Sequence, residues 1–253
     1  MRVAVVGAGP SGLATLKYLA KAHEFFPDLK PIEVKLFEAE AEIGGTFRYR
    51  AYEEAEVRTW TFCCSLASVI MSLTIRIQLV SSKFLTCYSD FRPRIDEPQF
   101  MSVTRYLEYL VEYCTRFGLW PHILLSTPVL SIRRRGEGHV VRYRSKDGAE
   151  EGWNCDAVAI CSGLHVTPEL PTIPGLENVP VVMHSSEYRT RKQFGENKTV
   201  AVLGVGETSR DISYLAVTSP TKRVVVCHRS GWVNAPKVTY RNPHAGILKE
   251  NIC

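Results

Sequence analysis

Residues 3–12 read Val-Ala-Val-Val-Gly-Ala-Gly-Pro-Ser-Gly, an apolar run that leads directly into a glycine-rich turn. Such an unbroken apolar run is expected of a central parallel strand that is covered on both faces. Glycine is needed at each of the three positions for a different purpose. Gly7 permits the tight turn, Gly9 lets a pyrophosphate approach the backbone, and Gly12 lets the next helix pack closely on the strand. The stretch therefore predicts a strand, a phosphate-binding turn and a helix in succession.

The residues after this turn complete a dinucleotide-binding unit. Helical spacing from Ser11 onward predicts a buried face formed by Leu13, Leu16, Tyr18, Leu19 and Ala22. A second strand is expected over residues 32–37, and it ends at Glu38. A carboxylate at that place accepts hydrogen bonds from a ribose 2′-hydroxyl and repels a 2′-phosphate. This unit therefore favours FAD or NAD over NADP.

The same pattern returns in the last quarter of the chain. An apolar run over 199–203 leads into Gly-Val-Gly-Glu-Thr-Ser at 204–209, where Ser209 takes the place of the third glycine. The next apolar run, 223–227, is followed by His-Arg and not by an acid. The guanidinium of Arg229 can pair with a 2′-phosphate through two parallel hydrogen bonds, so this unit favours NADP(H). A surface role without a ligand is the alternative for Arg229.

Composition adds few constraints on function. The chain carries a net charge of +5, with 45% hydrophobic and 23% charged residues, which is ordinary for a soluble enzyme. A mildly basic protein suits anionic phosphates and does not require nucleic acid as a partner. The compact basic run, Arg133 to Arg135, lies beside Gly136 at an expected hairpin turn. A solvated loop explains the run better than a nucleic-acid patch.

Cysteine usage and the apolar stretches indicate the compartment. Eight cysteines occur without a Cys-x-x-Cys pair or zinc-finger spacing, so no metal site is expected and free thiols in a reducing compartment are the default. Met1 and Arg2 lead directly into a strand, which argues against a secretory signal. The longest uncharged stretch, 59–75, is shorter than the about 20 residues of a membrane helix. We expect a cytoplasmic protein without a membrane span.

The middle of the chain reads as one helix and several strands. Ser102 can cap a helix that runs to about residue 117, with a buried stripe formed by Val103, Tyr106, Leu107, Leu110, Cys114 and Phe117. Strands are expected over 123–132, 139–144 and 156–160, and prolines after residue 167 mark a linker. We therefore assign residues 1–168 to an FAD-binding domain and 169–253 to a partial NADP-binding domain.

Several further motifs, in this order, resemble those of the flavin-containing monooxygenases, particularly fungal dimethylaniline monooxygenase-like proteins. Gly-Gly-Thr-Phe at 44–47 resembles the family's Gly-Gly-x-Trp element over the flavin, and 85–93 resembles its Tyr-Ser-Asp-Phe segment. Thr-Pro-Val at 127–129 resembles the place where the backbone meets the adenine, and 156–168 resembles the strand and turn that return to FAD. The resemblance implies an α/β fold with two Rossmann-like units, incomplete at the C-terminus.

The turn pattern and the resemblance together give the expected cofactor contacts. Those to FAD are Gly7, Gly9, Pro10, Ser11, Gly12, Glu38, Gly45, Thr46, Phe47, Val129, Ser162 and Gly163. Those to NADP(H) are Gly204, Gly206, Glu207, Thr208, Ser209 and Arg229. The contacts from Gly45 to Gly163 in the first set rest on the resemblance alone. No catalytic residue is assigned.

The chain also departs from the family pattern. Val80 stands where family members commonly carry Asn, and Asn178 and Pro180 replace the Phe and Gly of the identifying Phe-x-Gly-x-x-x-His-x-x-x-Tyr stretch. Residues 57–78 match nothing in the pattern, and their removal restores a continuous resemblance. We interpret them as a retained intron. A genuine apolar hairpin is the main alternative, because the stretch is rich in β-branched residues, and a membrane-surface segment has less support.

The resemblance implies a specific reaction. NADPH would reduce FAD, and the reduced flavin would use O₂ to oxygenate a soft nitrogen or sulfur centre of a small-molecule substrate. Such chemistry requires no acid–base pair from the protein. The alternatives are an NADPH-dependent flavin oxidoreductase that does not oxygenate, and an inactive truncated fragment that binds nucleotide. The sequence leaves the oligomeric state open.

Overall fold

In the computed structural model, the chain is described at residues 1–48, 79, 81–164, 167–229 and 231. The described residues form two compact units that divide between Pro168 and Glu169. The stretch 57–78, Val80 and nearly all residues after Arg229 lie outside the described residues, so the hypotheses on them stay predictions. No helix in the described part is long and apolar enough to span a bilayer.

A parallel four-stranded sheet lies at the centre of the first unit. Its strands, in the spatial order β3-β2-β1-β7, are Ile123–Leu124, Glu33–Phe37, Arg2–Val6 and Ala157–Ile160. The positions of β1, β2 and β7 confirm the strands expected over 3–6, 32–37 and 156–160. The strand expected over 123–132 was wrong in extent, because Thr127 and Pro128 interrupt it and the chain continues in a different sheet.

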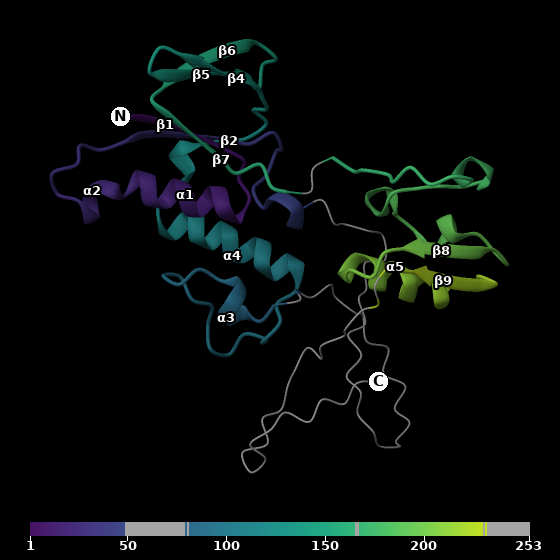
Figure 1. The fold of residues 1–253 in the computed structure, drawn as a ribbon. Coiled ribbons are helices and arrows are strands. Elements are labelled where there is room, and N and C mark those ends of the chain that lie inside the picture. The colour runs from purple at the N-terminus through teal and green to yellow at the C-terminus, as the bar shows by residue number, and fades with distance from the viewer. Residues whose placement is uncertain (49–78, 80, 165–166, 230, 232–253) are drawn as a thin grey trace. The chain divides into compact units, whose positions relative to one another are not determined.

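Helices cover one face of the parallel sheet, as Figure 1 shows. They are α1 (Pro10–Ala20), α2 (Ala22–Phe25) and α4 (Val103–Arg116), and the Oγ of Ser102 caps α4 by accepting the Arg105 N–H at 3.1 Å. Apolar side chains of α1 and α4 pack against Val5, Val34 and Leu36 of the sheet. This face is the main core of the unit.

Two expectations about the helical faces need correction. Tyr18 is 51% exposed and not buried, and its ring lies 3.9 Å from the ammonium of the buried Lys17. The buried face of α4 is wider than expected, since Tyr109 and Tyr113 are both almost fully buried. The Tyr109 ring can be buried because its hydroxyl has a partner: it donates to the Phe91 carbonyl at 2.7 Å.

A three-stranded antiparallel sheet covers the other face of the parallel sheet (Figure 1). It consists of β4 (Val129–Arg135), β5 (Gly138–Arg144) and β6 (Glu150–Cys155). The strand β6 was not predicted. The run Arg133 to Arg135 belongs to β4, so its placement in a turn was wrong. Val141, Tyr143 and Trp153 face the parallel sheet and pack against Ala4 and Phe37.

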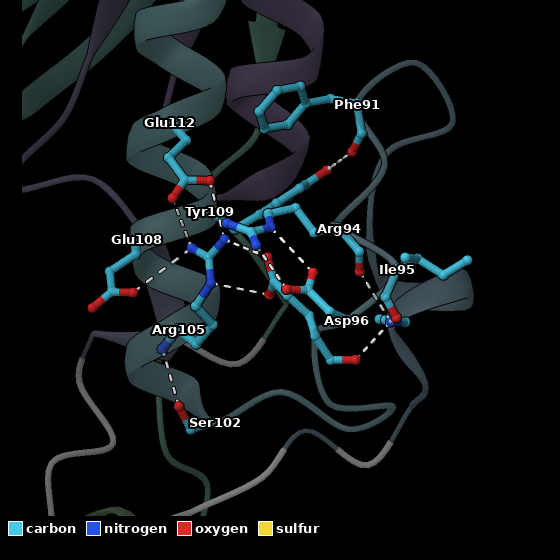
Figure 2. Close-up of polar contacts among 11 residues, drawn as sticks. Phe91, Arg94, Ile95, Asp96, Ser102, Arg105, Glu108, Tyr109 and Glu112 are labelled. Carbon is cyan, nitrogen blue, oxygen red and sulfur yellow. Dashed lines mark hydrogen bonds and ion pairs between the residues drawn. The ribbon is translucent and has the colours of Figure 1, made fainter.

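Residues 81–101 form a loop around the short helix α3 (Lys83–Thr86), and this loop is fastened to both long helices. Asp90 pairs with the buried Lys17 of α1. The Tyr88 hydroxyl donates to the Pro10 carbonyl at 2.5 Å, in the first turn of the same helix. On α4, Arg105 pairs with Glu97 of the loop and with Glu112, and Figure 2 shows this network. The hydrogen bond with Glu97 and that with Glu112 raise the pKa of Arg105 above its usual range.

The second unit repeats the strand–helix–strand pattern. It contains β8 (Thr199–Leu203), α5 (Glu207–Val217) and β9 (Arg223–Cys227), and the two strands pair in parallel over their whole length. Short 3-10 turns precede them at Leu176–Asn178, Ser185–Glu187 and Arg191–Phe194. Tyr188 and Phe194 pack with Leu215 and Ala216 of α5 as a small core.

Lys83 holds the 81–101 loop closed. It is only 4% exposed, and its ammonium donates to the carbonyls of Arg94 at 3.0 Å, Ile95 at 2.8 Å and Glu97 at 2.6 Å. Lys83→Met keeps the aliphatic stem but leaves three carbonyls without this donor, so we predict a loss of about 3 kcal/mol in the free energy of unfolding. Denaturant titration measures it. The exposed Lys30 provides a control, and a Lys83→Met variant no less stable than Lys30→Met would contradict the assignment.

Candidate functional site

The turn between β1 and α1 is built so that side chains are excluded from it. The Gly7 N–H donates to the Phe37 carbonyl at 2.8 Å, and Gly7 adopts φ +102°, which favours glycine. A Cβ on Gly7 would lie 2.5 Å from the Cys161 carbonyl oxygen, and one on Gly12 would lie 1.9 Å from the Gly7 oxygen. The helix therefore touches the turn directly, and only glycine fits at the contact.

The N-terminus of α1 offers unpaired donors. Gly9 is the N-cap, with φ −73° and ψ 177°, and it has no side chain to accept from the first-turn N–H groups. Pro10 occupies the first helical position, where the missing N–H costs nothing. The N–H groups of Ser11 and Gly12 follow, and the helix dipole adds partial positive charge there. Such an arrangement suits an anionic phosphate.

The segment 44–47 lies against this turn. The Gly44 N–H donates to the Ala8 carbonyl at 3.0 Å, and a Cβ on Gly45 would lie 2.9 Å from the Gly9 Cα. Thr46 is exposed, whereas Phe47 is half-buried with its ring edge-on to Tyr106 at a centroid distance of 4.8 Å. The structure therefore brings Gly45 to the phosphate turn, as the sequence expectation requires.

Glu38 connects three parts of the first site. Its side chain is buried, and its two carboxylate oxygens accept from the Ala8 N–H at 2.6 Å and the Glu40 N–H at 2.9 Å. Its own carbonyl accepts from the Thr127 N–H at 2.7 Å, which brings the segment leading to Val129 alongside the end of β2. A carboxylate has about four acceptor positions. Glu38 can therefore still accept from a ribose hydroxyl.

Ser162 and Gly163 follow β7 at the same edge of the sheet. The Cys161 N–H donates to the Val6 carbonyl at 2.8 Å, and the Cα of Ser162 would lie 3.4 Å from a Cβ on Gly7. Gly163 has φ +84°, and no heavy atom of the described residues beyond its chain neighbours lies within 4 Å of a Cβ placed on it. The carboxyl ends of β1, β2 and β7 thus carry every residue expected at the first site except the 44–47 segment and Val129.

The second unit repeats the backbone of the first turn. Gly204 has φ +112°, and its N–H donates to the Cys227 carbonyl at 2.9 Å. Gly206 is the N-cap of α5, with φ −72° and ψ 175°, again without a side-chain cap. These values are close to those of Gly7 and Gly9. Two stretches of different sequence therefore form the same turn.

The second turn is more open than the first. Among the described residues, no heavy atom beyond the chain neighbours lies within 4 Å of a Cβ placed on Gly204 or Gly206. Ser209 fits at the third position and donates its hydroxyl to the Gly206 carbonyl at 2.7 Å, whereas Gly12 has no room for a side chain. Thr208 is half-buried, and the exposed Glu207 pairs with Arg210 at 3.1 Å.

Arg229 lies beyond the carboxyl end of β9, which corresponds to the place of Glu38 after β2. Its side chain is exposed and makes no ion pair within the described residues. The preceding His228 accepts the Gly231 N–H on Nδ1 at 2.8 Å. The two sites therefore differ in the charge that follows the second strand: a buried carboxylate in the first and an exposed guanidinium in the second.

Comparison with known proteins assigns the family. The family model described as flavin-binding monooxygenase-like matches residues 1–251. The chain belongs to this family. The sequence-based resemblance to flavin-containing monooxygenases and the two-unit α/β fold class are thereby confirmed.

Several known proteins are similar to nearly the whole chain. Monooxygenase cfoE of Aspergillus candidus is 54% identical over 239 residues, covering 94% of this chain and 37% of the relative. Dimethylaniline monooxygenase [N-oxide-forming] 2 of Mus musculus is 30% identical, covering 92% and 41%. The structure of S-allyl-L-cysteine S-oxygenase from Allium sativum has a TM-score of 0.69 at 23% identity, covering 97% and 54%. The chain spans about two fifths of the length of its curated relatives.

Two residues that hold the first turn of this chain in place were not predicted from the sequence. Tyr88 and Lys17 fix α1 against the 81–101 loop, yet their partners lie 78 and 73 residues away in the chain. Only the Tyr-Ser-Asp-Phe motif gave a signal for them.

Burial raises the pKa of Tyr106 to about 12 and that of Cys114 to about 12, so both stay protonated at neutral pH and neither supplies a base.

The His and Tyr of the family-identifying stretch have structural roles in the second unit. His184 accepts the Ser186 N–H on Nδ1 at 3.2 Å and so caps the 3-10 turn Ser185–Glu187. Tyr188 is 2% exposed and stacks on Phe194 at a centroid distance of 5.1 Å. Neither residue follows the carboxyl end of a strand of the second unit, where the turn residues lie.

The first turn has no room for a Cβ at its third position, whereas the second turn already holds one. Alanine at this position should therefore change the free energy of unfolding by different amounts in the two units. Gly12→Ala forces a Cβ into the Gly7 carbonyl, so the helix must shift and the free energy of unfolding falls by about 2 kcal/mol or more. Ser209→Ala, at the matching position of the second unit, keeps an accommodated Cβ and costs about 0.5 kcal/mol or less. Thermal and denaturant unfolding compare the two. Equal losses would contradict the assigned contact.

Proposed function

We propose that this chain binds FAD at its first turn and NADP(H) at its second. We further propose that, holding both, it acts as an NADPH- and O₂-dependent monooxygenase on a soft nitrogen or sulfur centre. One observation carries the proposal: two turns share the same backbone, while the side chains after their second strands carry opposite charge. A carboxylate suits an unmodified ribose and a guanidinium suits a 2′-phosphate.

The first site fits FAD in its shape and its donors. Gly9 and Gly45 lie next to each other without side chains, so a pyrophosphate could approach the backbone there. The N–H groups of Ser11 and Gly12 at the N-terminus of α1 would donate to it. Glu38 would hold the adenosine ribose, and the backbone at Val129 would meet the adenine. The side chains of Thr46 and Phe47 and the turn at Ser162 and Gly163 would border the flavin end, as the family resemblance implies.

The second site fits NADP(H). Gly204 and Gly206 leave the backbone open, and the N–H groups at Glu207, Thr208 and Ser209 start α5 without a side-chain cap. Arg229 is exposed and lacks a carboxylate partner in the described part of the chain, which leaves its guanidinium available for a 2′-phosphate. Glu207 is turned toward Arg210, and this pairing reduces its repulsion of a phosphate.

When bound, the flavin supplies the redox and oxygen-transfer chemistry. The residues of this chain bind and orient the two cofactors, and the proposal assigns no proton transfer to them. The names of the relatives support the substrate class, because one is called N-oxide-forming and another an S-oxygenase. A small tertiary amine or thioether is therefore the proposed substrate, with O₂ as the second.

The coupling of NADPH to product tests this function. The chain reconstituted with FAD is given NADPH, O₂ and either dimethylaniline or a dialkyl sulfide, and product is compared with NADPH consumed. One N-oxide or sulfoxide per NADPH supports the monooxygenase. NADPH consumption that yields only hydrogen peroxide or a reduced acceptor assigns a non-oxygenating oxidoreductase. No consumption by a chain that retains no flavin assigns an inactive nucleotide-binding fragment.

Arg229 should set the preference for NADP(H). Removal of its charge by Arg229→Gln should weaken NADP⁺ binding about 10- to 100-fold, because a charge-assisted pair contributes about 1.5–3 kcal/mol. Binding of NAD⁺ should change little. Calorimetric titration measures both dissociation constants.

Arg223 supplies a matched control for that measurement. It is exposed at the amino end of the same strand, so Arg223→Gln makes the same charge change away from the turn. If both variants weaken NADP⁺ binding equally, the effect is general electrostatics and the role of Arg229 fails.

A cytoplasmic location is part of the proposal. Five cysteines lie in the described part of the chain, and all are free thiols: Cys87, Cys114, Cys155, Cys161 and Cys227. Free thiols are favoured in a reducing compartment. Localisation of a tagged chain to an oxidising compartment would contradict this part.

A further inference from the structure

The arginine run of β4 lies on a sheet face and not in a loop. The antiparallel register pairs Ser131 with Arg142 and Arg133 with Val140. Because side chains alternate along a strand, Arg133 and Arg135 share the face that Val140 and Arg142 occupy on β5. Four arginines therefore share one face of the three-stranded sheet: Arg133, Arg135, Arg142 and Arg144.

This face points to solvent. The opposite face carries Val141, Tyr143 and Trp153, which are buried against the parallel sheet. The four arginines are all exposed, and the side chains of Arg142 and Arg144 are 55% and 52% accessible. In Figure 1 the sheet β4–β6 forms an outer layer of the first unit, above β1, β2 and β7.

The charge on this face is largely uncompensated. Glu150 is the one carboxylate within ion-pair reach among the described residues, at 3.8 Å from Arg142 and 4.0 Å from Arg144. Both distances are at the long end of ion-pair contacts. Arg133 and Arg135 have no carboxylate partner in the described ranges. The face therefore carries about three net positive charges.

The shape and composition of this arginine face argue against nucleic acid. Base stacking needs exposed aromatic rings, yet Tyr143 and Trp153 point to the buried side. A duplex major groove is about 12 Å wide and admits a helix or a two-stranded ribbon. Three strands already span about 10 Å between their outer axes before side chains are added.

A folded protein partner is also a poor fit. Protein interfaces bind through a desolvated centre that is rich in aromatic and apolar anchors. By register, the residues between the arginines include Ser131, Gly152 and Asn154, which are polar or lack a side chain. The apolar side chains there are the half-buried Val140 and, at the β-bulge, Leu130, which is 41% exposed. The surface provides charge without an aromatic anchor. Such a surface suits a partner whose negative charge is spread over a broad area.

We propose that the arginine face docks this protein on an anionic phospholipid bilayer. A bilayer surface is broad and presents many phosphates and carboxylates, so it can meet all four guanidiniums at once. Each arginine near such a surface strengthens binding about fivefold, the equivalent of about 1 kcal/mol. Contact through charge alone is lost when salt shortens the screening length. This docking is peripheral and independent of cofactor binding.

Vesicle co-sedimentation tests the proposal. The chain should sediment with vesicles of phosphatidylcholine mixed with phosphatidylserine, and it should stay in solution with phosphatidylcholine alone. The triple variant Arg133→Gln, Arg135→Gln, Arg142→Gln should bind the mixed vesicles about 100-fold more weakly. High salt should release the parent chain. Circular dichroism and thermal melting check that the variant remains folded.

A second triple variant separates this face from overall charge. Lys192, Lys198 and Lys222 are exposed in the second unit, and their change to Gln removes the same charge elsewhere. This control should bind like the parent. Three results would overturn the proposal: no preference for anionic vesicles, an arginine variant that binds like the parent, or a control that loses binding equally. Binding of an RNA or duplex DNA probe in place of vesicles would assign the face to nucleic acid instead.

Discussion

The hydrogen bond from the Ala8 N–H to the buried Glu38 carboxylate is the contact on which the first site depends. It ties the phosphate turn to the end of β2 at 2.6 Å, and both partners are almost inaccessible to water. The carbonyl of Ala8 accepts from Gly44, and the carbonyl of Glu38 accepts from Thr127. Three segments distant in sequence therefore meet around one pair of residues. A buried carboxylate is tolerable only when it is paired in this way.

The described residues of the second unit contain no such internal connection. Its turn has the same backbone angles, but Arg229 is exposed where Glu38 is buried, and no described residue crowds Gly204. Contacts within the protein thus close the first turn, while the guanidinium beside the second turn stays exposed. The two turns share a backbone and differ in the residue that follows the second strand.

The parts of the fold that follow from local spacing were predictable. The strand, turn, helix and acid of the first unit lie where their sequence pattern indicates, since Gly7 and Gly12 stand where a Cβ would clash with the backbone. The strand β6 escaped prediction because only Trp153 and Cys155 need to be apolar, and its outer face is polar. The clamp formed by Tyr88, Asp90 and Lys17 depends on partners more than 70 residues apart, which one sequence does not reveal.

Visible absorbance during reduction tests the central claim, that one chain holds a flavin and a nicotinamide dinucleotide at paired turns. The chain is purified, mixed with FAD, freed of unbound cofactor and titrated with NADPH in the absence of oxygen. The account predicts a bound flavin spectrum that bleaches on addition of NADPH and changes far more slowly with NADH. A protein that retains no flavin, or a bound flavin that NADPH leaves oxidised, would contradict it.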